Sequence, residues 1–270
     1  GVDARLAAFF TERATLSRGY GKQYAHLWEA ARRASAGGKR FRPLLVLSAH
    51  DELGGTNHQA AIEVATAFEL LHTAFLLHDD LIDNDLLRRG LPNLSGSESG
   101  RARAAGLDDA DAGRWGAASA ILAGDLLIHF AQSMVARVDI PRDQRNALLD
   151  ILDESVFVTA AGELADVALS AGLHAADLAQ VLDMSSHKTA SYSFCGPLRA
   201  GAVLAGAETE TLDLLGNYGT LVGIAFQLKD DLLGVFGDEA VTGKSSLGDL
   251  RENKITPLIA YARSTSSWAD

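Results

Sequence analysis

Apolar side chains recur along this chain at the three- and four-residue spacing of an α-helix. The clearest run covers residues 57–83, where one stripe is formed by Ala61, Val64, Ala65, Phe68, Leu71 and Phe75. A stripe of this kind is typical of a helix with one buried face. Similar patterns cover roughly residues 114–134, 143–170, 187–204 and 209–234. Because no segment shows the two-residue alternation of a strand, the pattern predicts an all-α fold.

Three interruptions divide the helical pattern. A glycine pair at 37–38 precedes a helix whose first turn contains Pro43, a favourable early position for proline. Residues 88–113 and 237–253 are polar and contain several glycines, so both are predicted to be exposed loops. No linker or internal repeat separates domains. We therefore predict one domain over residues 1–270, a single bundle of many helices around a central cavity.

Composition and charge exclude several classes of function. The net charge is −11, which argues against a general nucleic-acid binder because contacts with phosphate backbones need a basic surface. The single cysteine, Cys195, cannot form an internal disulfide, which favours a reducing, cytoplasmic environment. No unbroken apolar run reaches the roughly 18 residues that cross a membrane, so no membrane span is predicted.

A first acidic cluster ends the apolar helix at residues 79–85. Asp79 and Asp83 are four residues apart and share a helix face, while Asp80 lies about 100° around the axis. Carboxylates at this spacing repel one another unless a cation lies between them, and Mg²⁺ prefers carboxylate oxygens. An isolated cluster of this kind is equally well explained as a solvated helix end. Here Arg88 and Arg89 follow closely, which favours a diphosphate held through Mg²⁺.

A second acidic cluster occurs about 150 residues later. Gln227, Asp230 and Asp231 stand at positions i, i+3 and i+4, so they are predicted to share one helix face. Two carboxylate clusters that face each other could hold several Mg²⁺ ions with a diphosphate between them. Either cluster alone is weak support for a site; the pair is much stronger.

Basic residues and one histidine accompany the acidic clusters. Three cations lie at the start of a predicted helix, where free backbone N–H groups favour anions: Lys39, Arg40 and Arg42. His72 precedes Asp79 by two helical turns on the same face, so we interpret it as a site residue although a lone helical histidine is more often structural.

Other lysines in loops or at helix starts are weaker candidates for the site, and one further acidic stretch is not a candidate. Lys188 and Thr189 open another predicted helix, and Lys244 and Lys254 flank the second loop. Loop lysines are usually solvated, so these residues gain weight only together with the acidic clusters. The acidic stretch at 108–111 has no apolar support and is interpreted as a solvated helix cap.

Taken in order, these motifs resemble those of the trans-isoprenyl diphosphate synthases, the polyprenyl synthetase family. The resemblance runs from about residue 37 to residue 257 through GGKRFRP, HDDLIDNDLLRRG, KTA and FQLKDDLLG. It implies an all-α bundle around a deep cavity, a homodimer, and Mg²⁺-dependent condensation of isopentenyl diphosphate with an allylic diphosphate.

The resemblance also implies a role for each matching residue. The diphosphate of isopentenyl diphosphate would be bound by Lys39, Arg42, His72 and Arg89. Mg²⁺ ions would be bound by Asp79, Asp80, Asp83 and Asp230, with Asp231 in support. The allylic diphosphate would contact Arg88, Lys188, Lys244 and Lys254. Thr189 and Gln227 would present oxygens near the allylic carbon.

The chain departs from the family pattern at a few positions. Gly234 stands where a third aspartate is common, which weakens a third carboxylate ligand in the second cluster. Glu163 stands where glutamine is common, and Glu163 and Asp166 are left outside the predicted site. The chain ends at Asp270, earlier than the family usually does, and we expect helices that close the fold to lie outside this sequence.

The residues before the first cluster suggest a product length. Ala74 is the fifth residue upstream of Asp79 and is small, whereas the fourth, Phe75, is aromatic. We expect a tunnel of medium depth and a C20 product, geranylgeranyl diphosphate, with a C15 or a longer product as alternatives. A terpene cyclase is the nearest enzymatic alternative, but it has no need for the isopentenyl diphosphate pocket that Lys39, Arg42 and Arg89 would provide. A non-catalytic partner subunit of a prenyl synthase remains the alternative of a different class.

Overall fold

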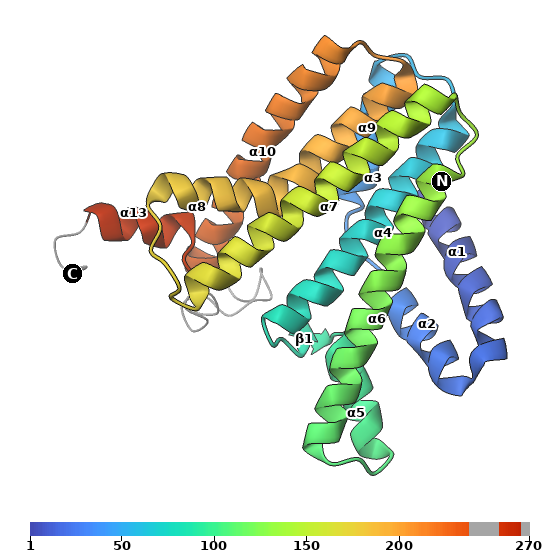
Figure 1. Cartoon of the computed structure of the whole chain (residues 1–270), viewed down its shortest axis with the longest axis vertical. Coiled ribbons are helices and arrows are strands. Elements are labelled where there is room, and N and C mark those ends of the chain that lie inside the picture. Colours follow the sequence, from blue (N-terminus) through green and yellow to red (C-terminus); the bar gives the residue numbers. More distant parts are fainter. Residues whose placement is uncertain (238–253, 266–270) are drawn as a thin grey trace.

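The computed structural model describes residues 1–237 and 254–265 and is built almost wholly from helices (Figure 1). The helices are α1 (Val2–Ser17), α2 (Lys22–Ala34), α3 (Phe41–Glu52), α4 (His58–Ile82), α5 (Leu94–Ala104), α6 (Asp109–Ala136), α7 (Arg142–Ser170), α8 (Leu178–Ser185), α9 (Gly196–Ala205), α10 (Thr209–Phe236) and α13 (Pro257–Thr265), with a short 3-10 turn η1 (Arg18–Tyr20) and a π-helix η2 (Ser186–Cys195). The only strands in these described ranges are β1 (Leu87–Arg88) and β2 (Leu91–Pro92), a small antiparallel hairpin. The prediction of an all-α fold is confirmed.

The core is organised around α4, which lies between α3 and α6 (Figure 1). The predicted apolar stripe is buried, since Val64, Phe68 and Leu71 are all 0% exposed. Asn57 begins the helix by accepting a hydrogen bond from the backbone N–H of Ala60. This burial fixes the direction of α4, so its last turn carries the first acidic cluster to a set position.

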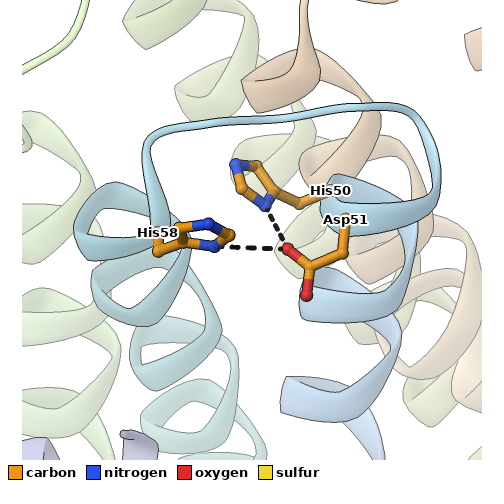
Figure 2. A group of neighbouring side chains, drawn as sticks. All are labelled: His50, Asp51 and His58. Carbon is orange, nitrogen blue, oxygen red and sulfur yellow. Dashed lines mark hydrogen bonds and ion pairs between the residues drawn. The ribbon is translucent and has the colours of Figure 1, made fainter.

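A short turn joins α3 to α4 and gathers three polar side chains. His50 and Asp51 lie in the last turn of α3, and His58 is the first residue of α4 (Figure 2). The turn closes through a hydrogen bond from the N–H of Gly55 to the carbonyl oxygen of His50. Gly54 has φ of 79°, a left-handed conformation that glycine adopts without strain.

The prediction that residues 88–113 form a loop is wrong, because this segment contains α5 and the start of α6. Asn93 caps α5 by accepting from the N–H of Gly96. Small residues on α5 and α6 allow these two helices to pack closely. A Cβ on Gly116 of α6 would lie 2.4 Å from the carbonyl oxygen of Ser95 on α5. Gly and Ser here mark contacts between helices rather than a flexible loop. The cap interpretation of 108–111 is confirmed, since Asp108 accepts from the N–H of Asp111.

The predicted helix at 187–204 is confirmed as helical but begins with the wider turns of η2 before α9 continues it. Two glycines allow neighbouring helices to approach η2 closely. A Cβ on Gly162 of α7 would lie 2.3 Å from the backbone nitrogen of Lys188, and one on Gly223 of α10 would lie 2.3 Å from the Cβ of Ala190. The π-helix is therefore held tightly between α7 and α10, and π-helical turns often occur at functional sites.

Two helices, α4 and α6, are long and apolar enough to cross a membrane when judged by length and composition alone. The apolar window of α4 is 72% buried inside the protein and that of α6 is 44% buried. A core helix of a soluble protein passes the same test, so this is weak support for a span. The absence of a membrane span stays a prediction.

Candidate active site

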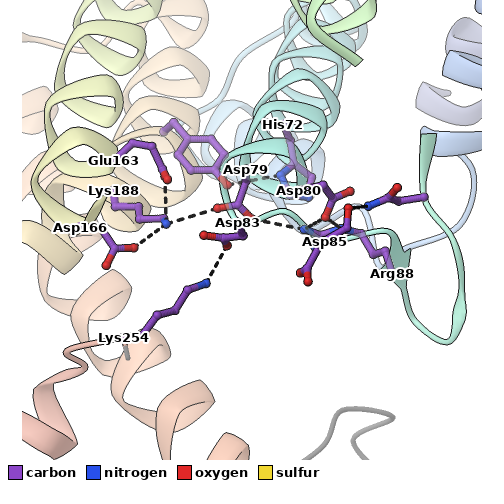
Figure 3. Close-up of polar contacts among 12 residues, drawn as sticks. His72, Asp79, Asp80, Asp83, Asp85, Arg88, Glu163, Asp166, Lys188 and Lys254 are labelled. Atoms are coloured by element: carbon purple, nitrogen blue, oxygen red, sulfur yellow. Dashed lines mark hydrogen bonds and ion pairs between the residues drawn. The ribbon is translucent and has the colours of Figure 1, made fainter. Parts of the chain in front are cut away.

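The last turn of α4 presents carboxylates that are all paired with cations (Figure 3). Asp80 is buried, and Arg88 on β1 donates from Nε to its Oδ1 at 2.8 Å. The same guanidinium donates to Oδ2 of Asp79 at 3.2 Å. The chain turns between α4 and β1, where the N–H of Asp85 donates to the carbonyl oxygen of Asp80, and Arg88 on β1 contacts the cluster after this turn.

Lys188 on η2 joins the cluster to α7. Its Nζ lies 3.3 Å from a carboxylate oxygen of Asp79, 2.9 Å from Glu163 and 2.7 Å from Asp166 (Figure 3). The close approach of α7 to η2 at Gly162 makes these contacts possible. One ammonium group therefore contacts three carboxylates from two other helices.

Lys254 reaches the cluster from the segment before α13. Its Nζ donates to Oδ2 of Asp83 at 2.6 Å, although 171 positions separate the two residues (Figure 3). Burial alone would lower the pKa of Lys254, but the hydrogen bond and charge of Asp83 outweigh it and raise that pKa. The lysine is therefore held charged beside the cluster.

Burial and charge shift the protonation of the site in opposite directions. Burial raises the pKa of Asp80 against the opposing guanidinium of Arg88, and burial likewise raises the pKa of Glu163 against Lys188. For Lys188, burial is outweighed by Asp79 and by the carboxylates of α7, so its pKa is raised. The cations stay charged, and they are the groups available to an incoming anion.

The donor set of the first cluster fits Mg²⁺. Its ligand atoms are carboxylate oxygens, the type that this ion prefers. Within residues 1–237 and 254–265, Asp79, Asp80 and Asp83 do not bring their oxygens within 4.8 Å of one another as a group of three. Mg²⁺ usually takes one or two carboxylates and completes its octahedron with phosphate oxygens and water. The spread of these carboxylates suits ions shared with a phosphorylated ligand rather than an all-protein cage.

The predicted basic group before α3 divides into two. Lys39 is exposed, and the guanidinium of Arg89 lies against Gly37 and Gly38, whose added Cβ atoms would each be 3.7 Å from it. Arg89 thus lies against the two glycines that directly precede Lys39 in the sequence. Arg40 instead pairs with Asp3 and with the buried Glu69, so it holds α1 and α4.

Arg42 and His72 meet at Tyr192 of η2. Arg42 donates to the hydroxyl oxygens of Tyr192 at 3.1 Å and Ser193 at 2.6 Å, and its guanidinium carbon lies 4.6 Å from the centre of the Tyr192 ring. Nδ1 of His72 lies 3.4 Å from the Tyr192 hydroxyl. Burial, then the charges of Arg42 and neighbouring arginines, hold the pKa of His72 well below its ordinary value. His72 is neutral near pH 7.

The two residues expected to set product length differ in their surroundings. Ala74 is 0% exposed and belongs to the main hydrophobic core. Phe75 is half-buried, and its ring meets that of Tyr192 edge-on with 4.9 Å between centroids. Phe75, rather than Ala74, borders the polar site residues.

The second acidic cluster is connected to η2 by a chain of hydrogen bonds. Thr189 donates from Oγ1 to Oε1 of Gln227 at 3.0 Å, and Nε2 of Gln227 donates to Oδ1 of Asp231 at 2.8 Å. Asp231 is buried, whereas Asp230 is exposed. Gln227 and Asp231 share a face of α10 as predicted, and that face meets η2. Lys244 lies outside the described residues.

The motifs and fold agree with comparisons to known proteins. A model of the polyprenyl synthetase family matches residues 25–269. The chain belongs to the polyprenyl synthetase family. It is 34% identical over 227 residues to a geranylgeranyl diphosphate synthase of Sulfolobus acidocaldarius, covering 83% of this chain and 63% of that protein. It is 38% identical over 231 residues to a geranylfarnesyl diphosphate synthase of Aeropyrum pernix, covering 84% and 67%.

The fold of this polyprenyl synthetase family member also matches a solved structure. A geranylgeranyl pyrophosphate synthase from Corynebacterium glutamicum, complexed with isoprenyl diphosphate and magnesium, aligns with a TM-score of 0.90 at 30% identity. The alignment covers 98% of this chain and 77% of that one. The chain thus spans 63 to 77% of the length of these relatives.

Sequence reasoning on this family member missed three side chains that complete the site. Glu163 and Asp166 were left out, yet both contact Lys188. Their spacing on α7, three residues apart on one face, was an available signal. Tyr192 gave no comparable signal, because an aromatic residue in an apolar helix is normally part of the core.

Proposed function

We propose that this chain is a trans-prenyltransferase that condenses isopentenyl diphosphate with an allylic diphosphate, with Mg²⁺ ions as cofactor. The observation that supports this most strongly is Asp79, whose carboxylate contacts both Arg88 and Lys188. One position thus brings together a carboxylate, the ligand type that Mg²⁺ prefers, and two cations of the type that binds phosphate. Membership of the polyprenyl synthetase family supports the same assignment.

The allylic diphosphate is proposed to bind at the first cluster. Arg88, Lys188 and Lys254 donate to its oxygens, and each exchanges its present carboxylate partner for the more highly charged phosphate. Mg²⁺, when bound by the aspartates, supplies Lewis-acid stabilisation of the leaving diphosphate. A well-placed donor to the developing charge contributes about 3–4 kcal/mol to the transition state.

Isopentenyl diphosphate is proposed to bind beside the start of α3. Arg89 lies against the two glycines that precede Lys39, and Arg42 is held by Tyr192 and Ser193. His72 is neutral, so it can hydrogen-bond without adding charge to the arginines around it. Two separate basic pockets hold two anionic substrates with their reacting carbons in contact, and this proximity lowers the barrier.

The proposed reaction balances without a redox partner. The allylic C–O bond breaks and its electron pair leaves with the diphosphate. The double bond of isopentenyl diphosphate forms the new C–C bond to the allylic carbon. A proton then leaves the adjacent carbon and restores a double bond, with the released diphosphate as its acceptor. Thr189 of η2 and Gln227 of α10, which are hydrogen-bonded to each other, are proposed to present oxygens near the allylic carbon.

We propose a C20 product, geranylgeranyl diphosphate. The half-buried ring of Phe75 beside Tyr192 would limit the depth available to the growing chain. The relatives named above include synthases of geranylgeranyl and of geranylfarnesyl diphosphate, so a longer product is the principal alternative, with C15 farnesyl diphosphate the other. A homodimer in the cytoplasm is part of the same proposal.

The function is tested by identifying products. The purified full-length protein is incubated with Mg²⁺, labelled isopentenyl diphosphate and, separately, C5, C10 and C15 allylic primers, and chain lengths are read by mass spectrometry. Elongated all-trans diphosphates ending mainly at C20 are expected. Elongation that stops at another length would overturn only the C20 proposal. A folded chain that elongates no primer would overturn the catalytic role and favour the partner-subunit alternative.

A further inference from the structure

A second cluster of potential metal ligands lies far from the aspartates, at the other end of α4. It consists of His50, Asp51 and His58, at the turn between α3 and α4 (Figure 2). In the part of the chain that the structure describes, it is the only group of three or more His, Cys, Asp or Glu residues whose ligand atoms all lie within 4.8 Å of one another. The rise of α4 over its length places it about 35 Å from the first acidic cluster.

The distances within this cluster suit a small divalent ion. Nδ1 of His50 lies 2.8 Å from Oδ1 of Asp51, and Nδ1 of His58 lies 3.4 Å from the same oxygen. A tetrahedral Zn²⁺ with bonds of about 2.0–2.1 Å separates its ligand atoms by about 3.3 Å. Both distances to Asp51 lie within about half an ångström of that spacing, and the ligand atoms of the two histidines lie within 4.8 Å of each other.

The position of His50 is fixed by the surrounding structure. Its side chain is 0% exposed, and a Cβ on Gly55 would lie 2.2 Å from its ring. The turn therefore requires glycine at this position in order to seat the imidazole. Nε2 of His50 is buried without a hydrogen-bond partner among the described residues. Nε2 is not the nitrogen that contacts Asp51, so Nδ1 is the atom through which His50 would bind an ion.

The other two groups leave room for solvent on one side. The side chain of Asp51 is 55% exposed and that of His58 is 70% exposed. An ion bound by all three residues would thus complete its coordination with water. Two imidazoles and one carboxylate form a ligand set typical of Zn²⁺ and related transition metals, whereas Mg²⁺ prefers oxygen alone.

We propose that His50, Asp51 and His58 form a site for a divalent transition-metal ion, best matched by Zn²⁺, that fastens α3 to α4. The ion links the last turn of one helix to the first residue of the next, so it binds the folded chain and stabilises it by mass action. The site is independent of prenyl transfer and shares no residue with the proposed active site.

Direct metal titration tests this site. The chain is stripped with a chelator, returned to excess Mg²⁺ so that carboxylate sites are occupied, and titrated with Zn²⁺ by calorimetry. Wild type is expected to bind one Zn²⁺ per chain and to melt at a higher temperature with the ion. The variant His58→Ala should bind at least about 100-fold more weakly, because even a partner that only orients a zinc ligand contributes about 10–100-fold.

His26→Ala is the matched control, since His26 is also an exposed helical histidine, on α2. It should bind Zn²⁺ as wild type does. Co²⁺ gives a second measurement, because a tetrahedral site with nitrogen ligands produces strong visible absorption, which His58→Ala should lose. Equal Zn²⁺ affinity in wild type and His58→Ala, or no Zn²⁺ binding by wild type, would overturn the proposal. Melting in chelator checks that the variant folds; if it does not, His58→Gln replaces it under the same criteria.

Discussion

The two acidic clusters use the same residue type but are built differently. In the first, Asp79, Asp80 and Asp83 each pair with a cation from another element or segment, so the cluster joins α4 to β1, to η2 and to the segment before α13. In the second, the structure shows a local contact along one face of α10, from Gln227 to Asp231, extended to η2 through Thr189.

The two clusters differ in the groups that the structure places beside their carboxylates. The first cluster holds cations that stay protonated beside carboxylates, so it can accept a highly charged anion without importing positive groups. The second contributes hydrogen-bonding oxygens in a fixed geometry, with Asp231 buried and Asp230 exposed. We infer that the first cluster contributes more to binding and ionising the allylic diphosphate, and the following changes test that ranking.

The largest effect is expected from Lys188→Met. Its loss removes a donor to the leaving diphosphate and leaves three carboxylates without their shared cation, so turnover should fall roughly 10²–10³-fold. The free energy of unfolding in chelator should fall by about 2–3 kcal/mol, somewhat less than for a fully buried pair. Steady-state kinetics and urea titration measure the two quantities.

Lys229→Met is the matched control, because Lys229 is an exposed lysine within the second cluster. It should change neither quantity appreciably. If Lys229→Met impaired turnover as much as Lys188→Met, the two clusters would not differ in the way argued above.

A smaller effect is expected from Gln227→Leu in the second cluster. The change breaks the hydrogen bonds from Thr189 and to Asp231, each contributing about 1 kcal/mol, so turnover should fall by up to roughly 30-fold. Gln59→Leu, at an exposed glutamine of α4, is the control. A loss as large as that of Lys188→Met would reverse the ranking of the clusters.

The pH dependence of stability should reveal the buried His72. Its folded pKa lies well below that of the unfolded chain, about 6.5. Below that pH the unfolded state binds a proton that the folded state does not, so stability falls as pH falls, by up to about 1.4 kcal/mol per pH unit. The variant His72→Gln should flatten this slope between pH 7.5 and pH 5.5 in urea titrations, whereas His26→Gln should not. An unchanged slope in His72→Gln would contradict the buried, neutral assignment.

The smallest change in rate, with a distinct change in product, is expected from Phe75→Ala. Removing the ring beside Tyr192 leaves a cavity, so the main product should lengthen by at least one five-carbon unit while turnover changes little. Mass spectrometry of the products measures it. Phe157→Ala, at an exposed ring on α7, is the control. An unaltered product distribution would remove Phe75 from the account of chain length.

Local signals in the sequence were enough to predict the longest helices, α4, α6, α7 and α10. The apolar stripe of α4 predicted 57–83, within one residue of the observed ends at either side, because its burial and its cap are determined by nearby residues. The helix α5 was missed for the opposite reason, because its signals depend on residues of other elements. Gly96 and Gly116 permit contacts with Leu86 and Ser95 that become visible only when the helices are packed together.

The composition of the candidate site was only partly predictable. The motifs named Asp79 and Lys188, but Glu163 and Asp166 join them only because Gly162 lets α7 approach η2. Contacts of this kind join positions more than twenty residues apart, and no periodic pattern reports them. The role of Tyr192 likewise depends on three partners from α3 and α4.

The most direct test of the central claim is whether the first cluster is a Mg²⁺-dependent diphosphate site. Binding of inorganic diphosphate is measured by calorimetry with and without Mg²⁺, in wild type, Asp79→Asn and Asp85→Asn. Asp85→Asn removes an equal charge two residues beyond Asp83. The account predicts binding that requires Mg²⁺, is at least about tenfold weaker in Asp79→Asn and is kept in Asp85→Asn. Binding that is independent of Mg²⁺, or equal in wild type and Asp79→Asn, would contradict it.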